Sequence, residues 1–396
     1  MLRLTAAGRL AAAGCVAVVL VSGCTQTRRA KPDAAHNRAA PTTKPTVTAP
    51  PTTEPPGTFT IDATGDLLMH EPVTQAARAL AGGQGYDFRP LLAQVRPILS
   101  AADLAICHME TPLSPDDKKI SYYPSFDAPN EIAAAASWAG FKTCTTASNH
   151  TLDQGAAGVQ ATLDALDAAH LLHVGTARSA AEQSWQIYDV RGVRVAHLDY
   201  TYGLNGIKVP AGKPWLVNLI DTRRILADAH QARLAGAQFV VVALHWGQEY
   251  QSAPTAQQKA LAQALLASPD IDFLYGCHVH VVQPIERING KYVAYGVGNF
   301  LSKHAPCCDT PPTRDGIILR ATVAREGDRY VVTEIRYTPT FVDPATMTVL
   351  PVPQDLKMPA LDPALRQQLR DSGQRTETAI NSLHTDQLGI QMDSGS

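Results

Sequence analysis

This chain of 396 residues lacks several features that would assign a function class at once. It contains no Cys-x-x-Cys spacing, which disfavours a zinc site built from thiolates. No internal repeat is visible, and the basic residues form no stripe. Residues 1–57 carry seven basic and two acidic side chains, so a whole-chain net charge of −2 leaves −7 on residues 58–396. A body this negative argues against nucleic acid as the partner.

The N-terminus has the features of a secretion signal. Arg3 and Arg9 precede an apolar run, Leu10 to Leu20, that is too short to span a bilayer comfortably. The segment ends in Val-Ser-Gly-Cys24, and small residues before a cysteine resemble the bacterial lipobox. This resemblance predicts a lipoprotein signal peptide over residues 1–24, lipidation of Cys24 and anchoring to the extracellular face of the cell membrane. The alternatives are an ordinary signal peptide with an incidental cysteine, and an uncleaved anchor.

Residues 25–57 are rich in Thr, Pro and Ala and contain almost no large apolar side chain. Such a segment cannot bury enough surface to fold, and its prolines favour extended geometry. We therefore predict a disordered Thr/Pro-rich linker that holds a folded domain away from a membrane or through a wall layer.

Five cysteines follow Cys24, an odd number that cannot all pair within one chain. Cys107 and Cys144 lie in two strand-like runs that lead to candidate ligand loops, and an exported protein permits a bridge between them. Two buried free thiols are the alternative at these positions.

The 339 residues after the linker fit one large α/β domain. Strand-like runs alternate with amphipathic, Ala- and Leu-rich stretches, as in a layered fold with the helices outside. N-caps are expected at Asp221 and Thr255. The predicted helices cover residues 88–99, 130–139, 158–169, 219–235 and 255–266.

Past His280 the pattern changes toward antiparallel β structure. Residues 281–287 and 291–297 flank Asn289-Gly290, which is a hairpin signal, and residues 316–323 and 330–337 flank a second turn. We predict two sheets packed face to face between helices, in a domain over residues 58–343. The tail over residues 344–396 is Pro-rich at first, and we expect one helix over 363–383 that packs on the surface.

Five strand-like runs end in side chains that ligate metals. In open α/β sheets ligands bind at the carboxyl edge of the strands, and carboxylate, amide and imidazole groups suit a divalent metal. The runs are 59–64 before Asp66, 104–107 before His108 and Glu110, 143–147 before Asn149 and His150, 239–244 before His245, and 271–275 before His278 and His280.

Taken in order, these motifs resemble the CapA family, a branch of the calcineurin-like metallophosphoesterase superfamily. The resemblance implies a four-layer α/β/β/α sandwich of metallophosphoesterase type with mixed sheets, a metal site at the sheet edge and an association with poly-γ-glutamate capsule synthesis. It covers roughly residues 58–340 and rests on six motifs: Gly65-Asp66, Met109-Glu110-Thr111, Ser148-Asn149-His150 with Asp153 and Gly155, His245-Trp246-Gly247 with Glu249-Tyr250, Gly276 with His278, His280 and Gln283, and Gly298-Asn299-Phe300.

The resemblance also implies roles for single residues. His150 resembles the superfamily histidine that protonates a leaving group, a task suited to a side chain that ordinarily titrates near neutrality. Asp153 is expected to orient His150. A bound ion would lower the pKa of a water molecule and polarise an oxygen of the substrate. The expected ligands of a divalent Mn, Zn or Fe ion are Asp66, Glu110, Asn149, His245, His278 and His280.

The chain departs from the superfamily pattern at the first metal position. Leu68 stands where the Asp-x-His motif has its histidine, so the first metal position lacks one ligand of the superfamily set. His70 is one candidate substitute, and His108, which stands where the family has asparagine, is either functional or only a neighbour. Other histidines, including His304, are expected to be structural. Residues expected to line the pocket or to shape the loops around it are Trp246, Glu249 and Asn299.

Two functions from different classes remain. One is a metal-dependent hydrolase or transferase at the cell surface that acts on poly-γ-glutamate or a related envelope polymer. The other is a non-catalytic accessory lipoprotein that binds or guides this anionic polymer during export, beside membrane-bound synthase partners. The missing Asp-x-His histidine favours the second, and the retained Asn149-His150 pair favours the first. A phosphoesterase ranks third because the dinuclear ligand set is incomplete.

Overall fold

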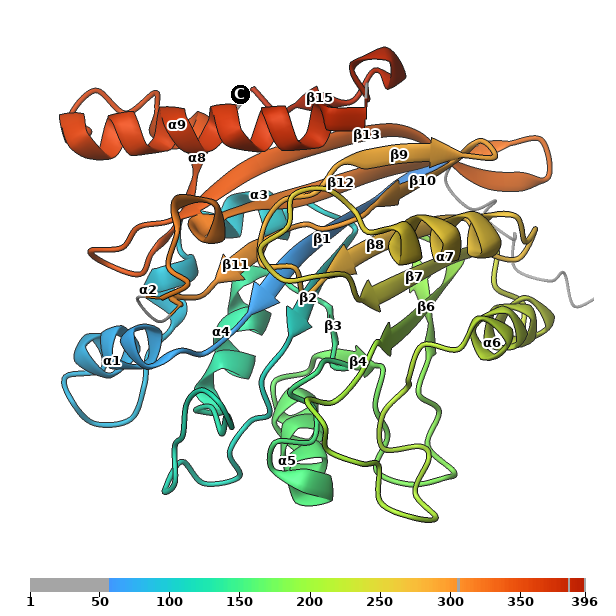
Figure 1. Cartoon of the computed structure of the whole chain (residues 1–396), viewed down its shortest axis with the longest axis horizontal. Helices are drawn as coiled ribbons and strands as arrows, with labels where there is room; N and C mark the ends of the chain where they lie inside the picture. The colour runs from blue at the N-terminus through green and yellow to red at the C-terminus, as the bar shows by residue number, and fades with distance from the viewer. Residues whose placement is uncertain (1–56, 305–306, 384, 395–396) are drawn as a thin grey trace, which may run out of the picture. The chain divides into compact units, whose positions relative to one another are not determined.

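The computed structural model describes residues 57–304, 307–383 and 385–394 (Figure 1). The expected signal peptide, Cys24 and nearly all of the expected linker lie outside the described residues. Within the described residues, none of the helices is both long enough and apolar enough to cross a membrane.

The first sheet is mixed and runs in the order β14-β13-β12-β1-β2-β3-β4, with β11 beside β1 and β15 beside β13. β1 to β4 pair in parallel, and so do β1 with β11 and β13 with β15, whereas the pairs β1–β12, β12–β13 and β13–β14 are antiparallel. The strands are β1 (Thr58–Leu67), β2 (Leu104–Met109), β3 (Thr143–Thr145), β4 (Leu172–Val174), β11 (Asn299–Leu301), β12 (Asp315–Glu326), β13 (Arg329–Val342), β14 (Val349–Pro351) and β15 (Gln391–Met392).

The second sheet runs in the order β5-β6-β7-β8-β10-β9, with a parallel centre and antiparallel edges. The predicted hairpin is β9 and β10, and its turn residues Asn289 and Gly290 have φ angles of 51° and 80°. These positive angles are what the Asn-Gly pair supplies at a hairpin turn. The strands are β5 (Gln186–Val190), β6 (Val193–Thr201), β7 (Phe239–His245), β8 (Phe273–Cys277), β9 (Ile285–Ile288) and β10 (Lys291–Ala294).

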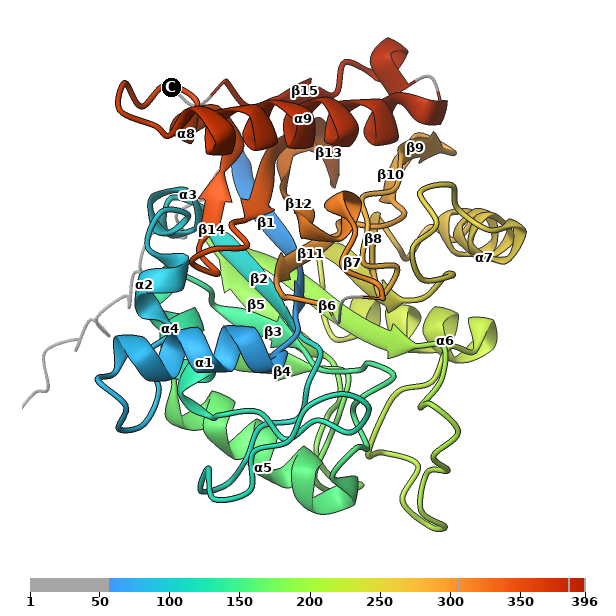
Figure 2. The same ribbon diagram turned by 60° about the vertical axis from the view of Figure 1, so that its left-hand side comes forward.

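Helices cover the outer faces of both sheets, which confirms the four-layer sandwich (Figure 2). Between the sheets lies an apolar core to which Phe59, Phe239 and Phe273 contribute fully buried rings. Helices α1 (Glu71–Leu80), α2 (Arg89–Leu92), α3 (Arg96–Ser100), α4 (Glu131–Ala139) and α5 (Gly155–Ala168) pack on the first sheet, and α6 (Thr222–Leu234) and α7 (Ala256–Leu266) pack on the second.

The predicted helix caps are confirmed, whereas one predicted helix is wrong in detail. The side chain of Asp221 accepts the N–H of Arg224, and Thr255 forms a capping box with Gln258. The helix expected over residues 88–99 is two short helices, because Pro97 cannot continue a helix and instead lies in the first turn of α3. Helix α1 was not predicted, although Pro72 in its first turn is a start signal.

The C-terminal tail is more than a surface helix. It supplies β14 and β15 to the first sheet, and α9 (Pro363–Ile380) packs against β12 and β13. Leu369 and Ile380 are fully buried, and Ile380 belongs to the core between the sheets. The shorter helices are α8 (Val352–Asp355) and the 3-10 turns η1 (Pro311–Arg314), η2 (Asn381–Leu383) and η3 (Thr385–Leu388). The domain therefore continues beyond residue 343.

A disulfide joins Cys107 to Cys144 across the neighbouring strands β2 and β3. The two residues are register partners in this parallel pair, with Cα atoms 4.5 Å apart, so the bridge is the alternative that the structure adopts. Cys277 is a buried free thiol, and Cys307 and Cys308 are also free.

Candidate metal centre

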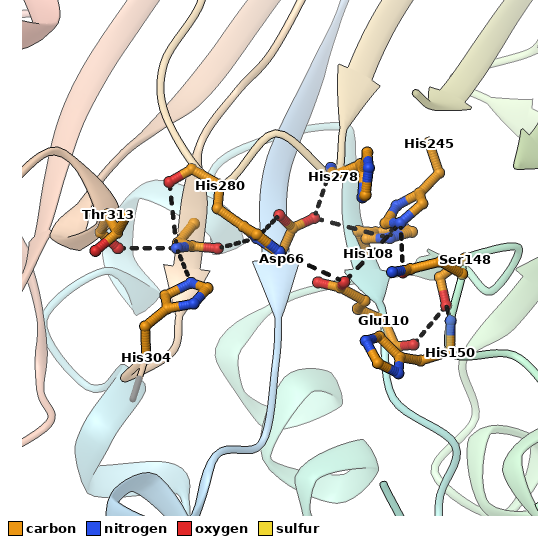
Figure 3. A network of polar contacts seen from close by, with 12 residues as sticks. Asp66, His108, Glu110, Ser148, His150, His245, His278, His280, His304 and Thr313 are labelled. Carbon is orange, nitrogen blue, oxygen red and sulfur yellow. Dashed lines mark hydrogen bonds and ion pairs between the residues drawn. The ribbon is translucent and has the colours of Figure 1, made fainter. Parts of the chain in front are cut away.

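Polar side chains from both sheets gather at one edge, where the carboxyl ends of their parallel strands meet (Figure 3). Figure 3 shows Asp66 in the middle of the cluster, with His280 on one side and His278, His245 and His108 on the other. The first sheet supplies Asp66 from β1, His108 from β2 and Glu110 just after β2. The second sheet supplies His245 from the end of β7 and His278 and His280 from the loop after β8.

The first group of potential ligand atoms comes from Asp66, His108 and His245, within 4.8 Å of one another. His108 Nδ1 lies 2.7 Å from Thr145 Oγ1, which turns Nε2 toward the cluster. That Nε2 lies 2.9 Å from His245 Nδ1 and 3.8 Å from Asp66 Oδ1. His108, for which the sequence left open whether it is functional or only a neighbour, thus lies within the cluster beside Asp66 and His245.

The second group consists of Glu110, His278 and His280, again with potential ligand atoms within 4.8 Å of one another. Both carboxylate oxygens of Glu110 and Nδ1 of His278 are buried and have no hydrogen-bond partner among the described residues. A nitrogen of His245 and one of His280 each lie 3.9 Å from Glu110 Oε1. A buried carboxylate without a donor is costly, so these orphaned atoms fit a bound cation.

Asn149 completes the expected ligand set. Its Oδ1 lies 2.9 Å from Nε2 of His245, and its Nδ2 donates to Asn205. The structure therefore brings all six sequence-predicted ligands to one place. The donors are carboxylate, amide and imidazole groups, a set that suits a divalent ion such as Mn, Fe or Zn.

Burial and mutual charge interactions shift the pKa values of the candidate ligands. Burial lowers the pKa of His108 to about 4 and that of His278 to about 3, so both rings are neutral, as a metal ligand must be. Burial and then the charge of Asp66 raise the pKa of Glu110 well above its usual range. Burial disfavours a charge on His280, but Glu110 and Asp66 outweigh it and raise the pKa of that ring to about 9.

The backbone at the cluster is unusual in two places. His278 and His280 have φ angles of 91° and 59°, in the left-handed region that residues other than glycine rarely adopt. The N–H of His278 donates to Asp66 Oδ1 over 3.4 Å, which ties this loop to β1. At Gly65 a Cβ atom would lie 1.8 Å from the carbonyl oxygen of Gly298, so only glycine allows β1 to approach there.

The predicted catalytic pair lies beside this cluster. His150 Nδ1 and Asp153 Oδ2 are 2.7 Å apart, and the same carboxylate oxygen accepts the backbone N–H of Phe126 over 2.8 Å. Both residues line a cleft of about 580 Å³ next to the cluster. Its described lining consists of Leu68, His70, Tyr123, Pro124, Ser125, Phe126, Asn149, His150, Asp153, Asn205, Ile207, Glu249, Tyr250, His280, His304, Cys307 and Cys308.

Of the two residues His70 and Trp246, both expected at the pocket, only His70 lines the cleft, and it does so without contacting Asp66 as a substitute ligand. No hydrogen bond or ion pair joins His70 to Asp66 within the described residues. His70 instead lines the cleft, and its Nδ1 accepts the N–H of Lys303. Trp246 does not line the cleft, because its indole is buried and donates to the carbonyl of Tyr295 over 2.9 Å. Trp246 therefore has the structural role that was the alternative.

Glu249 lines the cleft as expected, whereas Asn299 lies behind it. Asn299 Oδ1 lies 3.0 Å from His280 Nδ1, and Asn299 Nδ2 donates to the carbonyl of Thr313 over 2.8 Å. The same His280 nitrogen lies 3.1 Å from Asp66 Oδ2, so Asn299 and Asp66 together orient this candidate ligand.

Sequence reasoning missed two residues of the site. His304, expected to be structural, lines the cleft, and its ring centroid lies 4.6 Å from that of His280. The only sequence signal for His304 is its position five residues after Asn299. Asp199 is buried in β6 and accepts the N–H groups of Thr146 and Ala147, which hold the turn that carries Asn149. No local pattern marks Asp199, since its partners lie more than 50 residues away.

Comparison with known proteins assigns the family. The model of the bacterial capsule synthesis protein PGA_cap matches residues 60–304, which is more than half of the chain. The chain belongs to this family. It is 31% identical over 253 residues to the capsule biosynthesis protein CapA of Bacillus anthracis, covering 61% of this chain and 59% of that one. It is 28% identical over 280 residues to the PGA biosynthesis protein CapA of Bacillus subtilis, covering 68% and 70%.

Solved structures of distant proteins are also similar. A calcineurin-like phosphoesterase from Bacillus subtilis superposes with a TM-score of 0.44 at 13% identity, over 81% of this chain and 97% of that one. A 5'-nucleotidase precursor from Thermus thermophilus superposes with a TM-score of 0.46 at 13% identity, over 81% and 59%.

Proposed function

We propose that this PGA_cap family protein is a cell-surface, metal-dependent hydrolase or transferase that acts on poly-γ-glutamate or a related envelope polymer. The observation that carries the proposal is the buried carboxylate of Glu110, which has no hydrogen-bond partner among the described residues and lies among candidate histidine ligands beside the His150–Asp153 pair. A purely structural ion would need the ligands but not an acid at the wall of an open cleft.

The residues that would hold the ion are those of the two groups together with Asn149. When bound, a divalent ion supplies a water molecule of lowered pKa and a positive charge for an oxygen of the substrate. His150 uses Nδ1 for Asp153, which fixes its tautomer and leaves Nε2 for a proton transfer to the leaving group. Asp153 is itself held by the N–H of Phe126, so the pair is oriented before the substrate arrives.

The position of His108 supports catalysis over a vestigial site. The argument for an accessory protein was the absent histidine of the Asp-x-His motif. His108 Nε2 lies 3.8 Å from Asp66 Oδ1, so a histidine from the neighbouring strand is available where the motif lacks one. The accessory role remains the second candidate, because the names of the relatives concern capsule and PGA biosynthesis without stating a reaction.

Indirect observations support the proposed polymer substrate and the proposed location at the cell surface. The names of the two Bacillus proteins point to capsule or PGA biosynthesis as the setting. The Cys107–Cys144 disulfide is typical of exported proteins, which supports the expected signal peptide and the lipid anchor at Cys24. Membrane-bound synthase proteins are the partners that we propose on this basis.

The test uses the full-length protein in detergent, loaded with Mn²⁺, Fe²⁺ or Zn²⁺ and incubated with poly-γ-glutamate. We expect the chains to shorten, or their ends to be transferred to an added amine acceptor, and chelator to stop the reaction. His150→Ala should abolish the reaction and leave binding of the polymer unchanged, while Leu234→Ala, on an exposed position of α6, should change neither.

Two other outcomes contradict the proposed reaction. Co-sedimentation of the polymer without any change in chain length would favour the accessory role. Rapid cleavage of an aryl phosphate by the metal-loaded protein, with no action on the polymer, would favour a phosphoesterase.

A further inference from the structure

The cleft beside the metal centre offers little positive charge to a chain of carboxylates, except at the metal centre itself. Its described lining includes His280, whose pKa is raised to about 9, but no lysine or arginine, and its two carboxylates belong to Asp153 and Glu249. Lys303, whose backbone contacts His70, directs its ammonium group to Asp309. A polymer with one negative charge per unit would therefore meet repulsion along the cleft wall, except at the bound ion.

Three exposed side chains of the cleft are aromatic or aliphatic, and they lie in a lining that also includes the exposed polar residues Ser125 and Asn205. Tyr123 is 72% exposed, Tyr250 is 42% exposed and Ile207 is 41% exposed, although large apolar side chains are usually covered. Exposed aromatic rings in a cleft supply flat faces at a low cost in conformational entropy. These three side chains mark the wall as a surface for an uncharged, flat group.

Tyr250 is held in place by the metal-centre loop itself. Its φ angle is 64°, a strained value for an aromatic residue, and its N–H donates to the carbonyl of Val279 over 2.8 Å. Its ring centroid lies 5.9 Å from that of His280 and 5.7 Å from that of His304. The loop that carries two candidate ligands therefore also sets the position of this ring.

Glu249 fits a hydroxyl-rich ligand better than an anionic one. It is half-buried at the cleft and forms no ion pair with any residue in the part of the chain that the structure describes. An ionised carboxylate only accepts hydrogen bonds, and a sugar hydroxyl can donate one whereas another carboxylate cannot.

We infer that the cleft is a sugar subsite, in which Tyr250 and Tyr123 pack against a neutral pyranose ring and Glu249 accepts its hydroxyl groups. This inference rests on the proposed function and specifies it: the substrate carries a neutral glycan unit next to the group that reacts at the metal. A γ-glutamyl chain would reach the site only through a single carboxylate at its end or at its junction to the glycan.

The test measures binding to chelator-treated full-length protein by calorimetry, with two probes at low and high salt. The neutral probe is tetra-N-acetylchitotetraose, and the anionic probe is a γ-linked tetraglutamate. We expect the tetrasaccharide to bind with an affinity that changes less than about twofold between 50 mM and 500 mM NaCl, because screening acts on charges. The tetraglutamate should bind at least about tenfold more weakly.

Single substitutions test whether the two tyrosines bind the tetrasaccharide. Tyr123→Ala and Tyr250→Ala should each weaken tetrasaccharide binding by about three- to tenfold, the loss expected for one aromatic contact. Tyr250→Phe should bind as the wild type does, and Leu234→Ala is the control for an exposed apolar residue elsewhere. Tyr123 is so exposed that its loss leaves the fold intact, which keeps the test valid if Tyr250→Ala does not fold.

Three results would each overturn the inference. The tetrasaccharide does not bind, its affinity is unchanged by both tyrosine substitutions, or the tetraglutamate binds more tightly. These results differ from failure of the proposed function. Shortening of poly-γ-glutamate without saccharide binding would overturn the sugar subsite alone, whereas saccharide binding to a protein that takes up no metal would overturn the metal-dependent reaction alone.

Discussion

Replacing Glu110 by glutamine should stabilise the metal-free protein and remove the stabilisation that metal brings. Both oxygens of Glu110 are buried without a partner among the described residues, and Asp66 adds a second carboxylate to the same cluster. Burial and then the charge of Asp66 raise the pKa of Glu110, so the negative charge that this carboxyl carries in the unfolded chain is disfavoured in the folded protein. Glutamine has the size of glutamate and carries no such charge.

The sign and size of the effect follow from proton linkage. A raised pKa in the folded state costs nothing below the unfolded pKa of about 4.3, and the cost grows by about 1.4 kcal/mol for each pH unit until the folded group ionises. Glutamine leaves a neutral amide at this position, and an unsatisfied buried charge costs more than the about 1–3 kcal/mol of a neutral polar group, so we expect a gain of about 2 kcal/mol for Glu110→Gln at pH 7. For a chain of this size that is a Tm increase of about 4 °C.

The assay is thermal unfolding of the full-length wild type and Glu110→Gln, with chelator and with a divalent ion at about 100 times its Kd. The ion should stabilise the wild type by about 2.7 kcal/mol, or about 5 °C, and Glu110→Gln by much less. At pH 4 the two metal-free proteins should melt together. If metal-free Glu110→Gln melts below the wild type at pH 7, or shows the full metal shift, the reasoning about this carboxylate is wrong.

Three further predictions test other parts of the chain. His278→Ala with His280→Ala should reduce metal content, measured by elemental analysis, to the level of a chelated sample; equal content in both proteins would contradict the metal centre. Asp355→Asn should raise the Tm above pH 6 and leave it unchanged at pH 4, since burial raises the pKa of Asp355 to about 6 and the wild type loses stability as pH rises through that value. Cys24→Ala should release the protein from membranes or leave it unprocessed, and a mature-sized product still in the membrane fraction would argue against lipidation.

The pattern of neighbouring residues predicted much of the secondary structure and most of the residues that gather at the candidate site. Apolar runs of strand length, amphipathic stretches and caps such as Asp221 and Thr255 depend on neighbours in sequence, and they were placed correctly. The proximity of the candidate ligands was also predictable, because side chains that follow parallel strands reach one edge of the sheet whatever the rest of the fold does. The single helix predicted over residues 88–99 is wrong for a local reason, because Pro97 cannot continue a helix and lies in the first turn of α3.

Contacts between distant segments decided the rest. A search along the chain from Asp66 pointed to His70, whereas sheet pairing brings His108 of β2 beside Asp66 of β1. His304 became part of the cleft because the chain after β11 runs beside His280, and Asp199 supports the Asn149 turn from another sheet.

What the sequence alone determined is the set of elements and the kinds of ligand at their ends, because both follow from periodicity and chain direction. Only the tertiary structure decided which histidine completes the cluster, that Cys107 and Cys144 form a bridge, and that the tail adds strands to the first sheet. These outcomes depend on strand order and register, which are set by the packing of two apolar sheet faces and not by any local stretch of residues.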